Sequence, residues 1–131
     1  MQRKFRLTRS EDFKRVRRSG KSYAHPLVVL IVQTHDKRSN PDEDKQRTPM
    51  GQPRIRVGVA AGRTVGTAVY RNRAKRLLRE AMRSLIPSIT SGLDLILIAR
   101  PGLVSASLDE TRQALRILLQ RAQILIPLNE S

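Results

Sequence analysis

Six cations crowd into the thirteen residues between positions 71 and 83, which read Arg-Asn-Arg-Ala-Lys-Arg-Leu-Leu-Arg-Glu-Ala-Met-Arg. Guanidinium and ammonium groups at this density form charge-assisted hydrogen bonds to phosphates. A solvated surface helix usually alternates such cations with Glu in supporting i,i+4 pairs, but Glu80 is the only acid here. The imbalance favours a polyanionic partner over an ordinary surface helix.

On a helical projection this stretch separates into a basic side and an apolar side. The apolar positions are Tyr70, Ala74, Leu77, Leu78, Ala81 and Leu85, with Met82 at the edge. A helix that lies on a membrane surface needs Trp, Phe or many Leu on its apolar side, whereas this one has two alanines. We therefore expect the helix to pack on a sheet and to expose its cations.

The positive charge of the chain lies in two blocks. The formal net charge is +15 over 131 residues. Residues 1–23 carry nine Lys/Arg and two acids, and residues 54–83 carry nine Lys/Arg and one acid. A concentrated positive patch is typical of nucleic-acid-binding proteins. The length fits a single domain over residues 1–131.

No arrangement of residues suggests that the chain performs catalysis by itself. It has no cysteine, and His25 and His35 lack the spacing of metal ligands or of a catalytic triad. The carboxylate pairs at 11–12 and 109–110 fit helix N-termini, where acids complement the helix dipole. We expect no catalytic side chain and no metal held by the protein.

Membrane and export signals are also missing from the sequence. No apolar run approaches the roughly 18 residues of a membrane span, and no apolar stretch of a secretory signal follows the basic N-terminus. We therefore expect a soluble cytoplasmic protein without a membrane partner.

Two further helices flank the basic one. A capping box at Thr8–Glu11, with Ser10 as a rival N-cap, predicts a short helix that ends near Gly20. A second capping box at Ser107–Glu110 predicts a final helix to about Ile124.

Apolar or alternating runs at 26–34, 54–60 and 93–99 predict strands, with Arg54 and Arg56 pointing away from the core. Residues 36–53 are polar and rich in Pro, Ser, Asn and Asp, which predicts a flexible loop. The small residues from Gly62 to Thr67 lead into the basic helix, where Arg63 and backbone amides suit a phosphate.

Phe13 lies among cations on the predicted N-terminal helix. One interpretation is an apolar anchor that holds a short helix to the core. The other is a stacking platform for single-stranded nucleic acid, since aromatic rings beside cations suit that ligand.

Residues 65–80 closely resemble the Arg-Asn-Arg signature of the bacterial ribonuclease P protein subunit. They read Val-Gly-Thr-Ala-Val-Tyr-Arg-Asn-Arg-Ala-Lys-Arg-Leu-Leu-Arg-Glu. The resemblance continues in the Glu-Asp-Phe start, Gly20, Val57-Gly-Val and the strand end Leu-Ile-Leu-Ile-Ala-Arg-Pro. It covers the chain except residues 36–53 and the tail after about Ile124.

The resemblance implies an α+β fold of the ribosomal-protein-S5-domain-2-like type. This is a two-layer α/β sandwich of order αβββαβα with a left-handed β-α-β crossover. The resemblance also implies that the chain binds the catalytic RNA of ribonuclease P and the 5′ leader of precursor tRNA. Endonucleolytic removal of the leader would then depend on Mg²⁺ held mainly by the RNA. The chain would be enzymatic only within the holoenzyme, without a small-molecule substrate.

Site residues follow from the resemblance together with the basic side of the helix. The expected RNA-binding set is Arg63, Arg71, Asn72, Arg73, Lys75, Arg76, Arg79 and Arg83. The expected leader-binding cleft consists of Phe13, Arg15, Arg17, Ile31, Arg54 and Arg56.

The chain departs from the family pattern in this cleft. Arg17 stands where the family usually has a second aromatic, and Leu30-Ile31 stands where it often has another. Fewer rings for stacking imply that leader contact depends more on Arg15, Arg17 and phosphate charge.

Three other functions would use some of the same features. A ribosomal or RNA-chaperone protein would need the same basic helix without a role in cleavage. A stand-alone metal nuclease would need a carboxylate cluster, which the sequence lacks. A reader of double-stranded DNA would need more base-reading side chains than Asn72.

Replacing residues 36–53 by a short turn should leave precursor-tRNA cleavage unchanged, because the segment has no net charge and little apolar content. Cleavage rates of the shortened and full-length proteins with the same catalytic RNA test this. A large loss of activity would show that the segment takes part in binding.

Overall fold

A computed structural model describes residues 6–7, 9–34, 55–89 and 92–125. The predicted loop, Arg54 and Thr8 lie outside this part of the chain. In chain order the elements are α1 (Ser10–Ser19), β1 (Lys21–Ala24), β2 (Val28–Thr34), β3 (Ile55–Ala61), α3 (Ala68–Leu85), β4 (Leu93–Ala99) and α4 (Leu108–Arg121). The short 3₁₀ turns are η2 (Arg63–Val65), η3 (Ile86–Ser88) and η4 (Pro101–Ser105).

The order αβββαβα agrees with the order that the resemblance implied. The residue pattern itself missed β1, because its four residues are mostly exposed and carry no apolar run. Predicted strands at 26–34, 54–60 and 93–99 are confirmed within one or two residues.

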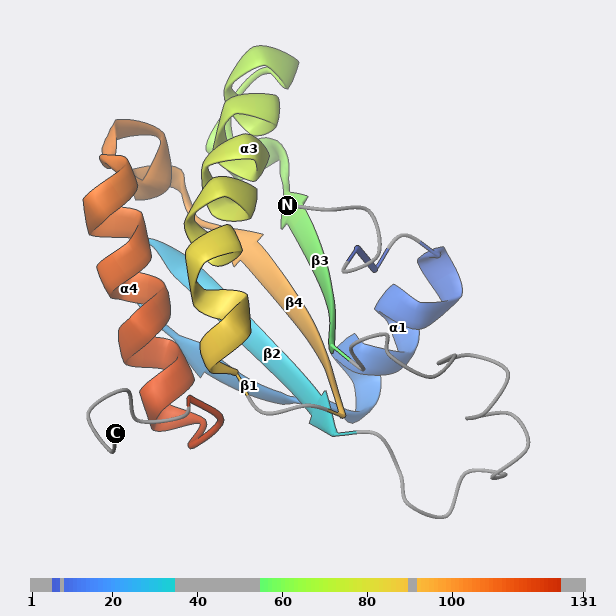
Figure 1. The fold of residues 1–131 in the computed structure, drawn as a ribbon. Helices are drawn as coiled ribbons and strands as arrows, with labels where there is room; N and C mark the ends of the chain where they lie inside the picture. The colour runs from blue at the N-terminus through green and yellow to red at the C-terminus, as the bar shows by residue number, and fades with distance from the viewer. Residues whose placement is uncertain (1–5, 8, 35–54, 90–91, 126–131) are drawn as a thin grey trace.

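The four strands form one sheet in the order β1-β2-β4-β3, in which β3 and β4 are parallel and the other pairs antiparallel. In Figure 1 both parallel strands run upward, α3 lies in front of the sheet, and β4 lies to the left of β3. This geometry makes the β3-α3-β4 connection left-handed, against the right-handed sense of about 98% of such connections. It agrees with the predicted crossover.

The main core lies between the sheet and helices α3 and α4, which cover the same face (Figure 1). The core side chains of α3 include Ala74, Leu78 and Ala81, all with no exposed surface. Thr111, Ala114, Leu115, Leu118 and Leu119 are buried from α4. The predicted two-layer packing of an amphipathic basic helix on a sheet is therefore confirmed.

Tyr70 departs from the predicted apolar side of α3, since 47% of its surface is exposed. The first turns of α3 extend past the end of the sheet (Figure 1), so no strand lies beneath them. The helical period placed Tyr70 on the correct side of the helix but could not show where the sheet ends.

Helix α1 packs on the opposite face of the sheet. Val16 of α1 is buried with Leu7, Ile31 and Ile96, and Phe13, Val29 and Ile98 pack around them. This small second core adds a short third element to the two main layers.

The ends of α1 differ from the predicted caps. Arg9 is the N-cap residue, so Ser10 is the first helical residue and not the cap. At the other end Gly20 has φ −81°, which any residue can adopt. Gly20 is instead required for close approach, because a Cβ there would lie 2.4 Å from the Val16 carbonyl oxygen and 2.7 Å from Ile31 Cγ2.

A buried carboxylate fastens α1 to this face. Asp94 on β4 has no exposed surface, and its Oδ1 and Oδ2 accept hydrogen bonds from Arg56 Nε and Nη2 at 3.0 and 2.9 Å. Arg15 Nη2 of α1 donates to Asp94 Oδ2 at 2.7 Å and to Asp12 Oδ1 at 3.1 Å. Arg15 also donates to Gln33 of β2. The cluster joins α1 to three neighbouring strands.

Arg15 keeps its charge in this cluster. Burial lowers the pKa of its guanidinium, but the hydrogen bonds to Asp94 and Asp12 raise it by more, so the net shift of the Arg15 pKa is upward. A cation with a raised pKa stabilises the fold at every pH below its unfolded value. The stabilisation by Arg15 is therefore constant across the neutral range.

Asp94→Asn should lower the free energy of unfolding by about 3 kcal/mol, because two guanidinium groups lose their buried counter-charge but remain partly hydrated. Urea denaturation followed by circular dichroism measures the change.

Asp109→Asn is the matched control, since the Asp109 side chain is 87% exposed and its partner, Arg112, lies 3.2 Å away at the surface. It should change stability little. Equal effects of the two substitutions would contradict the anchoring role of Asp94.

Candidate nucleic-acid interface

The chain enters α3 through a tight turn after β3. Gly66 has φ +135° and ψ −152°, a conformation that essentially only glycine adopts, and Thr67 follows as the N-cap. The amides of Val65 and Gly66 donate to the carbonyls of Gly62 and Arg63 at 3.1 Å each. These two amides are therefore occupied. Thr67 makes no side-chain cap hydrogen bond, so the amides of the first turn of α3 and the exposed Arg63 side chain are what this end of the helix offers to a phosphate.

The basic side of α3 is displayed as the sequence predicts. Asn72, Arg73, Arg76 and Arg83 are exposed, and Arg71, Lys75 and Arg79 are half-buried. At 1.5 Å per residue the cations extend over roughly 18 Å of helix. Arg83 lies at the far end, where its Nη1 is 3.6 Å from Glu80 Oε1.

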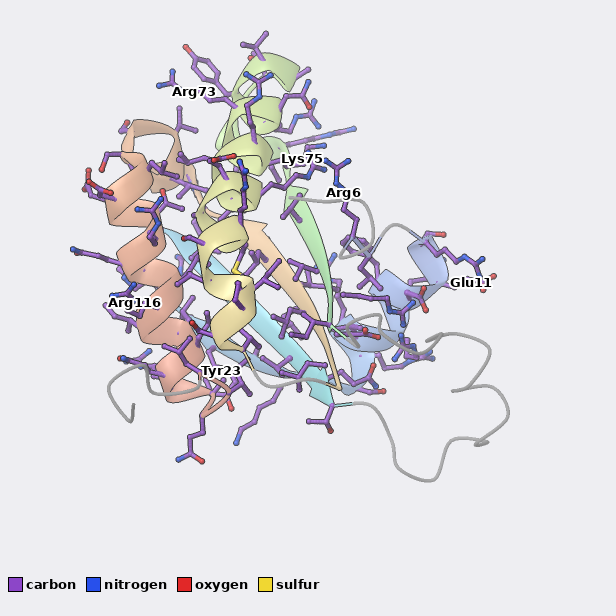
Figure 2. The ribbon with its side chains drawn as sticks, in the orientation of Figure 1. Arg6, Glu11, Tyr23, Arg73, Lys75 and Arg116 are labelled. Carbon is purple, nitrogen blue, oxygen red and sulfur yellow. The ribbon has the colours of Figure 1, made fainter. Side chains whose placement is uncertain are left out.

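A hollow of about 390 Å³ lies beside α3, lined by Arg6, Asn72, Lys75, Arg76, Arg79 and Glu80. Arg6 and Leu7 run along β3: Arg6 forms a parallel bridge with Val57, whose carbonyl accepts a 2.8 Å hydrogen bond from the Leu7 amide. Figure 2 shows Arg6 and Lys75 approaching each other. The structure thus brings four predicted RNA-binding residues together with Arg6, which the sequence reasoning did not single out.

Like charges face each other across this hollow. Burial lowers the pKa of Arg79, and the charge of Arg6 lowers it further. Glu80 is the one acid among the lining residues. An anion placed in the hollow would reduce the repulsion between the cations.

Arg71 offers a further donor. Its Nε is buried and has no hydrogen-bond acceptor within the described part of the chain. A buried donor without an acceptor is unfavourable, and because this atom has no exposed surface, a ligand oxygen would reach it only after the Arg71 side chain moved.

Arg73 lies apart from the hollow. Figure 2 shows Arg73 and Lys75 pointing to opposite sides of α3. The predicted RNA-binding set therefore surrounds the exposed side of the helix instead of forming one compact cluster.

The second face of the sheet, which α1 covers, contains the described members of the predicted leader-binding set. Phe13 is half-buried, and its ring lies against Gly58, where a Cβ would come within 2.4 Å of Phe13 Cζ. Arg17 is exposed, whereas Ile31 is only 7% exposed beneath α1. The ring is therefore at least an anchor of α1.

Two other predicted cleft residues already have partners. Arg15 and Arg56 are bound to Asp94, and their side chains remain 35% and 31% exposed. Any leader contact would use the hydrated part of these guanidinium groups. The sequence pattern predicted a strand at 93–99 but indicated no partner for Asp94 within it.

Val29 and Ile98 form an apolar surface that the predicted cleft did not include. They are paired across β2 and β4, both are half-buried, and both pack against the same small core as Phe13. Strand alternation already places Val29 on the face of Ile31, and this was the available signal.

The described residues contain no group of three acidic or histidine side chains that could hold a metal ion. Within the same part of the chain, no helix is both long and apolar enough to cross a membrane.

Comparison with known proteins gives consistent matches. A ribonuclease P protein component from Herpetosiphon aurantiacus is 40% identical over 124 residues, covering 95% of this chain and 89% of that protein. The corresponding protein of Brevibacillus brevis is 34% identical over 125 residues, with 95% and 88% covered.

Solved structures agree in fold. The RNase P protein of Thermotoga maritima is 27% identical and superposes with a TM-score of 0.68 over 88% of this chain and 96% of that chain. The Staphylococcus aureus RNase P protein superposes with a TM-score of 0.71 over 92% and 97%, and at 24% identity it supports the fold alone. The family model of ribonuclease P matches residues 1–123, and with these relatives it shows that the chain belongs to the ribonuclease P protein family.

Proposed function

We propose that this chain is the protein subunit of a ribonuclease P ribonucleoprotein. In that role it binds the catalytic RNA and the 5′ leader of precursor tRNA, and it assists Mg²⁺-dependent removal of the leader. The observation that carries the proposal is the cationic side of α3, with a hollow that Arg6 also lines, in a chain whose relatives are ribonuclease P protein components.

The exposed side of α3 is the proposed contact with the catalytic RNA. Arg6, Lys75 and Arg79 approach from two segments of the chain, so a phosphate in the hollow would meet several cations at once. Arg71 adds a half-buried cation from the same helix. Arg63 and Arg83 extend the surface at both ends of the helix.

The second face of the sheet is the proposed path of the leader. Val29 and Ile98 give an apolar floor, Phe13 provides an aromatic ring, and Arg17 is an exposed cation beside them on α1. Apolar and aromatic surface flanked by cations suits single-stranded nucleic acid without selecting its sequence. Arg15 and Arg56 would add charge from their exposed parts.

The catalytic Mg²⁺ belongs to the RNA in this proposal. The carboxylates of the second face do not fit a metal, because Asp94 and Asp12 are already bonded to guanidinium groups. The protein would reduce repulsion between the phosphates of two RNAs, and so lower the Mg²⁺ concentration that the assembly needs. The proposed location is the cytoplasm, where such a complex would meet its precursors.

The deciding experiment is precursor-tRNA cleavage by the catalytic RNA of ribonuclease P at low Mg²⁺, with and without this protein. Strong stimulation is expected, and the protein alone should cleave nothing. Tight binding to structured RNA without stimulation would leave a general RNA-binding or chaperone function. Cleavage by the pure protein would indicate a nuclease with its own site.

Arg71→Ala combined with Arg73→Ala should weaken binding to the catalytic RNA. The slope of log K against log salt should fall by about two, because about one unit is lost for each phosphate contact. Filter binding over a range of KCl concentrations measures both quantities.

Arg112→Ala with Arg116→Ala removes the same charge from α4 and should leave the slope unchanged (Figure 2 labels Arg116). If the Arg71/Arg73 double variant kept the same slope of log K against log salt as this control, Arg71 and Arg73 would be excluded from the interface.

A further inference from the structure

Two exposed apolar side chains stand at the start of the basic helix. Val69 is 75% exposed and Tyr70 is 47% exposed, and in the described part of the chain the only other large apolar side chain so exposed is Ile117 of α4. Apolar surface inside a strongly cationic patch usually marks a contact site. This surface was not part of the expected RNA-binding set.

We propose that Tyr70 is a stacking site for an unpaired nucleobase of the bound RNA. The inference rests on the proposed function and assigns one more contact within it. A base inside a duplex has both faces covered by its neighbours, so the ligand is a base in a loop, a bulge or a single strand.

The Tyr70 ring is held in place before any ligand binds. A Cβ built on Gly66 would lie 3.1 Å from Tyr70 Cδ2 and 3.3 Å from Tyr70 Cβ, so the side chain lies against the backbone of the turn. Gly66 has φ +135°, which keeps a larger residue from replacing it without strain. A ring already fixed on one side loses little conformational entropy when a base stacks on the exposed part.

Two exposed cations, Arg73 and Arg63, lie close to Tyr70 along the chain, and they suit phosphates of the same strand. Arg73 follows Tyr70 by three residues on α3, so the two side chains are neighbours on one side of the helix. Arg63 is exposed on the η2 turn that precedes the helix. This side faces away from the hollow at Lys75, as Figure 2 shows for Arg73, so a base on Tyr70 and a phosphate in the hollow would lie on different sides of α3.

Tyr23 provides an internal contrast. It is half-buried on β1, packs against the main core, and has Lys21 Nζ at 5.8 Å from the centre of its ring. Tyr23 therefore has a structural role that explains its ring, whereas Tyr70 has surface that no described residue covers.

The test compares the affinities of Tyr70→Phe and Tyr70→Leu for the catalytic RNA at several salt concentrations. Phe keeps the ring and should bind within about twofold of the unsubstituted protein. Leu keeps apolar bulk without a ring and should bind roughly 5- to 150-fold more weakly. Neither substitution removes a charge, so the salt slope should not change, in contrast to Arg73→Ala, which should lower it by about one.

Thermal unfolding checks that a loss of affinity is not a loss of fold. The midpoint for Tyr70→Leu should stay close to that of the unsubstituted protein, since nearly half of the Tyr70 surface is exposed and Tyr70 is not part of the main core. Tyr70→Ala, which favours the helix, repeats the comparison if Leu disturbs the turn. Tyr23→Phe is the matched control and should leave affinity unchanged.

Two outcomes would overturn the inference. Full affinity of both Tyr70→Leu and Tyr70→Ala would show that the ring does not contact RNA. An equal loss in Tyr70→Phe would assign the effect to the hydroxyl and exclude stacking. Either result is compatible with strong stimulation of cleavage by the unsubstituted protein, so it leaves the proposed function standing. Failure of that stimulation would instead refute the proposed function.

Discussion

The cationic surface of α3 depends on one interaction, the burial of the narrow apolar side of the same helix. Six cations with one acid repel each other along the helix, and a short isolated helix is marginal in water even without such repulsion. Ala74, Leu78, Ala81 and Met82 lose all their exposed surface against the sheet and its neighbours. Tertiary packing, and not helix propensity, therefore holds the cations in a fixed array.

A second constraint acts on the other face of the sheet. Helix α1 has a single fully buried residue, Val16, so apolar packing alone gives it little hold. Asp94 adds to the attachment of α1, because it accepts hydrogen bonds from Arg15 of α1 and from Arg56 of β3. Arg15 and Arg56 therefore hold α1 to the sheet and also place positive charge beside the proposed leader path.

Much of this arrangement could be predicted from the sequence because periodicity reports directly on burial. The amphipathic pattern placed α3, the capping box at Ser107 and Glu110 is present in the structure, and the apolar runs became strands. What periodicity could not supply was the length of the sheet under α3, which decides that Tyr70 is exposed. It also could not show that Arg6 would reach α3, because their proximity comes from the bridge to Val57.

The resemblance supplied what local patterns could not. Strand β1 is too short and too exposed to be recognised by itself, and handedness leaves no trace in the residue pattern. Asp94 is a different case. An acid within an apolar strand is visible in the sequence, but its two arginine partners could not be predicted because they lie 38 and 79 residues away along the chain. Long-range ion pairing of this kind becomes visible only in three dimensions.

The left-handedness of the β3-α3-β4 connection decides which face of the sheet α3 covers. With the same strand positions, a right-handed connection would place α3 on the opposite face of the sheet, which α1 and its small core already cover. The two proposed RNA-binding surfaces would then share one side of a four-stranded sheet. The left-handed path keeps α3 and α1 on opposite faces, so the proposed contact with the catalytic RNA and the proposed leader path do not overlap in this chain of 131 residues.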